Sequence, residues 1–302
     1  SYGLPLDFRL IGGLEYDHRD RTGSATTTSH RNRTDEISYR AELRRSISET
    51  ITGAISYIHS DRSGSNFLTN VTGNGDPFFN LIAPFNLSDR SRNKARLSVN
   101  WQPTEQLSLQ FIIDESLDNY GHRANSDVGL RKGSARNYSL DASYIFSEAW
   151  QATAWFSRNE TQIDQASRNP VSPDGTREVW SVKLQDLGTS VGIGLNGKPT
   201  NKLEIGANLN YSDVINKFKQ KVQIDPEINS VPNTSFQLGS LRLFAKYALQ
   251  KNIALRLDYM LDDFKTDEWT WNRWTYTDGT RLTQDTNQLV NFIGFSAYYS
   301  WQ

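Results

Sequence analysis

Four histidines and acids such as the adjacent pair Asp114 and Glu115 are side chains in this sequence that could carry chemistry. The histidines are His18, His30, His59 and His122. A metal site needs ligands at a short and regular spacing, and no two of these histidines have it, so we expect solvated residues at strand ends or in loops. Asp114 and Glu115 would have to face one another to share a proton, but neighbours along a strand point to opposite faces.

The other signatures of catalysis are also missing from the sequence. It contains no G-x-S-x-G nucleophile motif and no glycine-rich phosphate loop. It has no cysteine, which excludes disulfides, thiolate chemistry, iron–sulfur clusters and covalent haem attachment. We therefore predict no catalytic residue, no metal ligand and no cofactor in this chain, and we expect that it is not an enzyme.

The composition points away from both a soluble globular domain and a disordered chain. Only 36% of the 302 residues are hydrophobic and the mean hydropathy is −0.63, yet 12% are aromatic. A membrane barrel reconciles these values, because lipid meets only every second residue of each strand. The 33 basic and 34 acidic residues nearly cancel, which argues against a nucleic-acid partner.

No apolar run in the sequence approaches the length of a membrane-spanning helix. Residues 1–4 have no basic or apolar region of the kind that marks a signal peptide. We therefore expect either that a signal has been removed or that the chain begins inside a longer protein.

Apolar and polar residues alternate along the whole chain, which is the pattern of strands with one apolar and one polar face. In the first run, Leu10 and Leu14 lie on one face, and Arg9 and Glu15 lie on the other. In the eighth run the apolar positions change parity, so we predict a β-bulge near residues 186–188. The predicted strands lie at about 8–16, 37–44, 51–57, 95–101, 107–113, 138–146, 150–156, 178–195, 203–211, 241–249, 253–261 and 293–301.

The connections between these strands alternate in length. Tight turns are expected at 48–50, 103–105, 147–149, 196–201 and 250–252, and long polar loops at 18–35, 60–92, 117–135, 161–177, 213–238 and 264–287. Bacterial outer-membrane barrels have short turns on the periplasmic side and long loops outside. A soluble β-sandwich would have shorter strands and would not sort its loops by length.

The predicted fold is therefore an all-β, transmembrane, antiparallel up-and-down β-barrel with about 12 strands in this chain, in the bacterial outer membrane. We treat residues 1–302 as one domain, which either closes alone or forms the C-terminal part of a larger barrel. Both chain ends fall on the periplasmic side in this topology.

Aromatic residues on the apolar positions gather at the two ends of the predicted strands. Aromatic side chains are common in strands generally, but this clustering favours the girdles that barrels place at the two membrane interfaces. The outer girdle would be Tyr16, Tyr39, Tyr57, Tyr138, Tyr211 and Tyr259. The periplasmic girdle would be Trp101, Phe146, Trp150, Tyr247, Tyr299 and Trp301.

Charged residues recur on the opposite positions, which would face the lumen. They either pair across strands and hold water, or form a polar wall against a bound protein or a selective pore. The candidates are Arg9, Arg40, Glu42, Arg44, Arg96, Asp114, Asp141, Glu204, Arg256 and Asp258.

Two of the predicted loops have unusual compositions. Residues 76–85 read DPFFNLIAPF, which could fold into the lumen, meet a partner protein or form a small core within the loop. Residues 269–279 are rich in tryptophan and contain an Asp-Gly turn, so the last hairpin could extend well beyond the membrane.

The C-terminal third resembles the MtrB/PioB family of decahaem-associated outer-membrane barrels. The resemblance rests on VPNT at 231–234, LRLFAKYAL at 241–249, LRLDY at 255–259, DEWTW at 267–271, YTDG at 276–279 and YYSWQ at 298–302. Weaker similarities are YDHRD at 16–20 and WSVKLQD at 180–186. Family barrels are longer, and the N-terminal Cys-x-x-Cys of many members is absent here.

The resemblance implies a porin-like barrel that sheathes a periplasmic multihaem c-type cytochrome, so that electrons cross the outer membrane for extracellular electron transfer. The haem would be carried by the partner, and an extracellular cytochrome could dock on the outer loops. A 12-strand ring would be narrow for such a partner. The alternative is a stand-alone porin passing small polar solutes.

Overall fold

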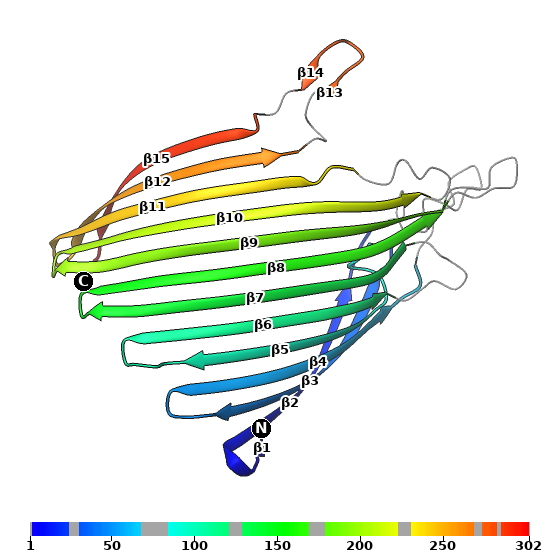
Figure 1. Cartoon of the computed structure of the whole chain (residues 1–302), viewed down its shortest axis with the longest axis horizontal. Helices are drawn as coiled ribbons and strands as arrows, with labels where there is room; N and C mark the ends of the chain where they lie inside the picture. The colour runs from blue at the N-terminus through cyan, green and yellow to red at the C-terminus, as the bar shows by residue number, and fades with distance from the viewer. Residues whose placement is uncertain are drawn as a thin grey trace, which may run out of the picture.

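A computed structural model describes residues 2–23, 30–67, 84–120, 129–168, 179–222, 231–268, 274–282 and 285–301. These residues form one antiparallel sheet of 13 strands and one separate two-stranded hairpin (Figure 1). The sheet consists of β1 (Tyr2–Gly3), β2 (Phe8–Asp20), β3 (Arg33–Ser46), β4 (Ile51–Gly64), β5 (Arg90–Trp101), β6 (Leu107–Tyr120), β7 (Gly129–Ser147), β8 (Trp150–Arg168), β9 (Val179–Thr200), β10 (Leu203–Val222), β11 (Thr234–Gln250), β12 (Ile253–Asp267) and β15 (Asn287–Tyr299).

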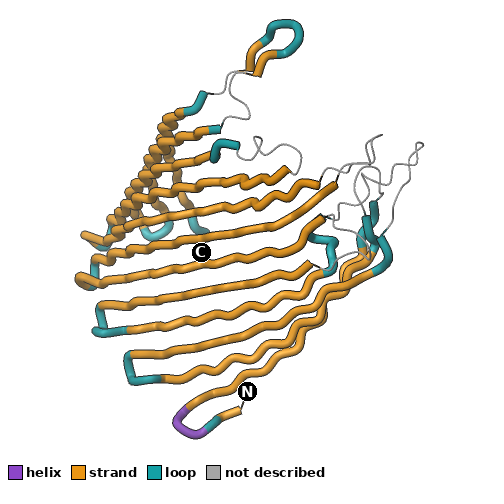
Figure 2. Tube along the Cα trace, turned by 45° about the vertical axis from the view of Figure 1, so that its right-hand side comes forward, coloured by secondary structure: helices purple, strands orange, loops and turns teal. Residues whose placement is uncertain are grey.

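Each strand of the sheet pairs with its neighbours in the order of the chain, without a crossover. The sheet is strongly curved and stays open, with β1 and β15 as its two edges (Figure 2). This confirms the predicted all-β, up-and-down architecture, and each of the twelve predicted runs corresponds to one long strand, β2 to β12 and β15. The thirteenth strand is the two-residue β1.

The alternation of turns and loops is also confirmed. Short connections at 47–50, 102–106, 148–149, 201–202 and 251–252 lie at one end of the sheet, and the long ones lie at the other (Figure 1). We refer to these as the turn end and the loop end. The turn before β10 is shorter than expected because β9 continues to Thr200.

Most strands are longer than the apolar alternation indicates, and they extend at the loop end. β8 continues to Arg168 and β10 to Val222, and β11 begins at Thr234, so part of the loops expected at 161–177 and 213–238 is strand. Backbone pairing holds these extensions together, and it needs no apolar face once the strand has passed the apolar band.

The predicted β-bulge at 186–188 is wrong. The pairing of β9 with β8 runs without a register shift from Val179 to Gly197, and its pairing with β10 is regular through the same stretch. Leu184 therefore lies on the opposite face of the sheet from Ile193. The parity of the apolar residues changes because the outer part of β9 lies beyond the apolar band. There the sequence can place apolar residues at the positions that face the other side of the sheet.

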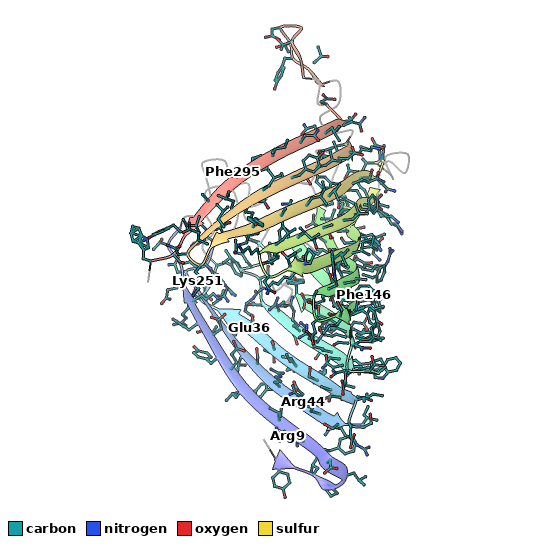
Figure 3. All side chains as sticks on the ribbon, turned by 90° about the vertical axis from the view of Figure 1, so that its left-hand side faces the viewer. Arg9, Glu36, Arg44, Phe146, Lys251 and Phe295 are labelled. Carbon is teal, nitrogen blue, oxygen red and sulfur yellow. The ribbon has the colours of Figure 1, made fainter. Side chains whose placement is uncertain are left out.

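The sheet has two distinct faces. The apolar face carries the residues on the apolar positions, such as Leu14, which is 69% exposed. The polar face carries Glu42, Ser56, Ser60, Asp118 and Ser240, all buried. Curvature explains the difference, because side chains on the inner side of a curved sheet crowd together. In Figure 3, Phe146 and Phe295 lie outside the curve, whereas Arg44 and Glu36 lie within it.

Two small elements complete the fold. The described residues contain one short helix, the 3₁₀ turn Pro5–Asp7, and no helix long and apolar enough to cross a membrane. The hairpin of β13 (Trp274–Thr275) and β14 (Arg281–Leu282) stands away from the sheet at the loop end (Figure 1). The Asp-Gly turn expected there closes it: Gly279 has a φ of +85°, and the Thr280 amide donates to the Asp278 side chain at 2.9 Å.

Several sequence features fall outside the described residues, namely His122, the apolar stretch up to residue 83, and tryptophans 269 and 271.

Candidate functional site: the polar face and its rim

Seven of the ten charged residues expected to face the lumen form ion-paired clusters on the polar face. Glu42 lies between two arginines of its own strand, and its carboxylate accepts hydrogen bonds from Arg40 and, at 3.0 Å, from Arg44. These residues are two apart, so β3 itself places them in a row on one face. The cluster leaves a net positive charge beside a buried carboxylate.

Two further pairs lie elsewhere on the polar face. Arg96 donates two hydrogen bonds to the Asp114 carboxylate of the next strand, at 2.8 and 2.7 Å, with Lys94 at 3.7 Å from the same group. Arg256 and Asp258 pair along β12 at 2.8–2.9 Å. As expected, Glu115 lies on the other face, where Arg136 donates to it at 2.8 Å.

The remaining three candidates are Arg9, Asp141 and Glu204. Arg9 is directly opposite Arg44 in the register, so like charges meet there. Asp141 is opposite Trp155, and Glu204 is opposite Lys246. Among the described side chains, no ion pair within 4.0 Å joins Arg9, Asp141 or Glu204 to another residue.

A second polar network lies at the loop end of β3 to β6, where the sequence predicts mainly loops. Arg92 donates two hydrogen bonds to Asp118 at 2.6 and 2.7 Å, and Arg90 donates to Glu36 at 2.8 Å. These residues were missed because they lie past the apolar alternation. Reading the polar parity beyond the apolar run would have found them.

This network also anchors the end of the longest loop over the polar face. Arg62 donates to the carbonyl oxygens of Ser88 and Phe85 at 3.0 and 2.6 Å. Arg31 donates to Leu87 O at 3.2 Å and to Asp89 at 2.6 Å. Hydrogen bonds from two arginines therefore hold the described part of that loop over the polar face, and Leu87 is buried there.

The polar face of β11, β12 and β15 carries large apolar side chains that sequence reasoning missed. Phe236 and Phe264 form an edge-to-face pair with ring centroids 4.5 Å apart. Arg256 lies over the ring of Phe244 at 4.4 Å. Phe292 on β15 is 53% exposed on this face. The signal was present in the sequence, because residues 234–250 have apolar residues at both parities.

The outer girdle tyrosines lie on the apolar face, but not at strand ends. Three of them make the same kind of hydrogen bond to the neighbouring strand. The hydroxyls of Tyr16, Tyr57 and Tyr259 donate to the side chains of Asp35, Asn93 and Asn291 at 2.6, 2.6 and 2.9 Å, respectively. Each acceptor lies two residues further toward the loop end than the residue opposite the tyrosine. The tyrosines thus mark the end of the apolar band, beyond which the strands continue. Tyr39, Tyr138 and Tyr211 are exposed on the same face.

The aromatic residues expected for the periplasmic girdle lie near the turn end, also on the apolar face. Trp101, Phe146, Tyr247, Tyr299 and Trp301 are exposed, and Trp150 lies against Gly197, where an added Cβ would overlap its ring. Tyr299 and Trp301 form an edge-to-face pair at 5.3 Å. Rings at both ends of an apolar band are what two membrane interfaces require.

Two histidines lie just beyond the tyrosines, outside the apolar band. His18 has Asp35 at 2.7 Å from one ring nitrogen and Asp20 at 3.1 Å from the other. His59 contacts Asn93 and Asp61 in the same way. Hydrogen bonding to Asp35, then to Asp20, raises the pKa of His18, and hydrogen bonding to Asn93, then to Asp61, raises that of His59. In the described parts of the chain, no three His, Cys, Asp or Glu residues are arranged to hold a metal ion.

Comparison with known proteins matches this geometry to outer-membrane barrels. Outer membrane protein MtrB of Shewanella baltica (strain OS185) is 24% identical over 271 residues, which are 89% of this chain and 36% of that protein. The chain thus spans about a third of the length of this relative.

Solved structures show the same fold at low identity. The unliganded ferric citrate transporter FecA superposes with a TM-score of 0.56 at 11% identity, over 100% of this chain and 43% of that one. The copper transporter OprC gives 0.57 at 10% identity, over 98% and 44%.

A family model for outer membrane beta-barrel porins, MtrB/PioB, matches residues 1–301, so the similarity extends well beyond the C-terminal third. With its curved up-and-down sheet and two contrasting faces, the chain belongs to the MtrB/PioB family of outer-membrane β-barrels.

Proposed function

We propose that this chain forms part of the wall of an outer-membrane barrel. The barrel encloses a periplasmic multihaem c-type cytochrome, and electrons cross the membrane through this cytochrome. The apolar face contacts lipid and the ten charged candidates of the polar face line the interior. The cytochrome supplies the haems, so this chain binds no cofactor, and an extracellular cytochrome docks on the outer loops. We also propose that the chain is not an enzyme, since its family is a porin-like one.

The observation that carries this proposal is the aromatic part of the polar face. The interior of a water-filled porin is polar. Here Phe236, Phe292 and Tyr298 are 40%, 53% and 47% exposed on the face that lines the interior. Exposed aromatic side chains are the residues that protein interfaces bury. A folded partner seated against β11, β12 and β15 would cover them.

The charges of the polar face are consistent with a protein partner. Glu36, Glu42, Asp114, Asp118 and Asp258 are all hydrogen-bonded to arginines of the same sheet. Carboxylates that are already paired do not need water or a mobile ion for neutralisation. The wall can therefore be dehydrated by a partner at a lower cost than a wall of unpaired charges.

The second candidate function is a porin that passes small polar solutes. The inward serines Ser38 and Ser60, joined by a hydrogen bond of 2.8 Å, and the charge-lined face of β2 to β6 would suit a water-filled interior. The two functions differ in what occupies the lumen. A porin conducts ions alone, whereas a sheath is filled by its partner.

The test is co-purification of haem with the barrel protein from outer membranes, using a pair of matched variants. Phe292 and Phe295 are neighbours on β15 that lie on opposite faces. We expect Phe292→Ala to lower the haem absorbance per barrel severalfold and Phe295→Ala to leave it unchanged. Single-channel conductance in a planar bilayer provides the second readout.

Three outcomes would decide between the functions. Loss of haem in Phe292→Ala alone would support the sheath. Equal amounts of haem in both variants would show that the aromatic surface is not part of the interface with the cytochrome. A haem-free barrel with a steady ion conductance would exclude the sheath and establish the porin.

A further inference from the structure

An apolar groove runs along the apolar face of β7 to β10. It consists of two adjoining hollows of about 390 and 380 Å³. Small residues form its floor, including Ala142, Ala154 and Ala207, while Tyr144, Phe156 and Leu209 are among its larger lining residues. Because these floor residues are small, an acyl chain can lie close to the backbone here.

A basic hollow of about 520 Å³ lies on the same four strands, at the loop end. Its basic lining residues are Arg131, Lys132, Lys183, Lys219 and Lys221, and Asp164 is its one acidic residue. An excess of positive charge is therefore concentrated on the strand extensions beyond the apolar band.

The register brings two of these lysines together. Lys183 of β9 is directly opposite Lys219 of β10, and like charges in that position destabilise a sheet. No ion pair within 4.0 Å involves Lys183, Lys219 or Lys221 in the part of the chain that the structure describes. Asp164 of β8 is directly opposite both Lys132 and Lys183, so it offsets part of this positive charge, and a bound anion would neutralise the excess.

The groove and the basic hollow are in line with each other. Lys219 follows Tyr211, and Lys183 precedes Val191, by eight residues on the same face, which is about 26 Å along the strand. Short turns on the periplasmic side place the loop end outside the cell. In tilted strands, about 26 Å along the strand is about 20 Å in height, so the basic hollow lies above the hydrocarbon layer, at the level of the sugars attached to the lipid head groups.

We propose that β7 to β10 form a binding site for lipopolysaccharide of the outer leaflet. Its acyl chains occupy the apolar groove, and phosphate groups on its outer sugars bind Lys132, Lys183, Lys219 and Lys221. The lysine ammonium groups act as point charges toward phosphate, with Ser181 of the lining as a further polar contact. The site rests on the proposed contact of the apolar face with lipid, and it is independent of the cytochrome.

The experiment compares two triple variants of the barrel protein purified from outer membranes. Lys183→Gln/Lys219→Gln/Lys221→Gln removes three charges from the hollow. Lys198→Gln/Lys202→Gln/Lys251→Gln removes the same charge from the turn end and is the matched control. Retained lipopolysaccharide is measured by native mass spectrometry, and the gel shift of folded barrels on heating checks that each variant is folded.

We expect the first triple variant to retain at least tenfold less lipopolysaccharide, because each lysine near a membrane surface contributes roughly fivefold. The control should retain the wild-type amount. Retention by wild type should fall with rising salt, and chemically dephosphorylated lipopolysaccharide should bind as weakly as the variant.

Other outcomes would overturn the proposal. Equal retention by both folded variants would mean that the basic hollow does not bind this lipid. Displacement of lipopolysaccharide by millimolar inorganic phosphate would identify a free-phosphate site instead. Because haem is measured separately, loss of lipopolysaccharide with haem retained concerns this site alone, and loss of haem with lipopolysaccharide retained concerns the sheath alone.

Discussion

Replacing Glu42 by glutamine removes the carboxylate that neutralises Arg40 and Arg44. The Glu42 side chain is 6% exposed, whereas those of the two arginines are 51% and 53% exposed. The amide keeps the shape and one acceptor oxygen, so the change isolates the charge. Arg44 is also opposite Arg9, so the substitution leaves three arginines on adjacent positions without a carboxylate between them.

The expected loss follows from how far each partner is buried. Breaking a fully buried ion pair costs about 3–5 kcal/mol, and an exposed pair contributes at most about 1 kcal/mol. Here the acid is buried and the bases are half exposed, which places the expected loss at about 1–2 kcal/mol. The loss should be smaller at high salt, because the repulsion among the half-exposed arginines is screened.

The assay is denaturant unfolding of the barrel protein in detergent, followed by tryptophan fluorescence. Glu115→Gln is the matched control, because Glu115 also accepts from an arginine but is 45% exposed on the opposite face. Its loss should stay below about 1 kcal/mol. If Glu42→Gln lowers the free energy of unfolding no more than Glu115→Gln, the buried carboxylate does not stabilise the polar face as argued.

Two further predictions concern the loop end. Gly64→Ala would place a Cβ into the Arg33 carbonyl oxygen of the paired strand, which a side-chain movement cannot relieve. It should cost about 1–3 kcal/mol and expose residues 65–67 to proteolysis, whereas Gly12→Ala, with no atom nearer than 4.0 Å, should not. Hydrogen bonds to Asp35 and Asp20 raise the pKa of His18, so their stabilising effect is complete below the pH where an unfolded histidine titrates. It is lost as the pH rises through the raised pKa. In an NMR titration, Asp35→Asn should lower the pKa of His18, and an unchanged midpoint would exclude Asp35 as its cause.

The alternation of apolar residues predicted the long strands and the order of turns and loops because lipid imposes that alternation. The alternation of apolar and polar residues ends where the strands leave the lipid. Beyond Tyr211, β10 continues through a stretch that includes Lys217, Lys219 and Lys221, which reads as a polar loop although its backbone is fully paired with β9. The false bulge in β9 has the same origin.

The polar face was harder to predict, for a different reason. Parity places Arg40, Glu42 and Arg44 on one face, and the structure brings all three together. Parity cannot say which charges meet between strands, because that depends on the register. The ion pair of Arg92 with Asp118 and the contact of Phe236 with Phe264 both require knowledge of which residues are opposite.

The uneven extension of the strands beyond the tyrosines gives the barrel wall a sloping rim. β10 runs eleven residues past Tyr211, to Val222, whereas β2 runs four residues past Tyr16, to Asp20. A difference of seven residues is about 23 Å along a strand, and about 18 Å in height once the strands tilt. Within the part of the wall that this chain forms, a large molecule approaching from the loop end meets the strand end of β10 before that of β2.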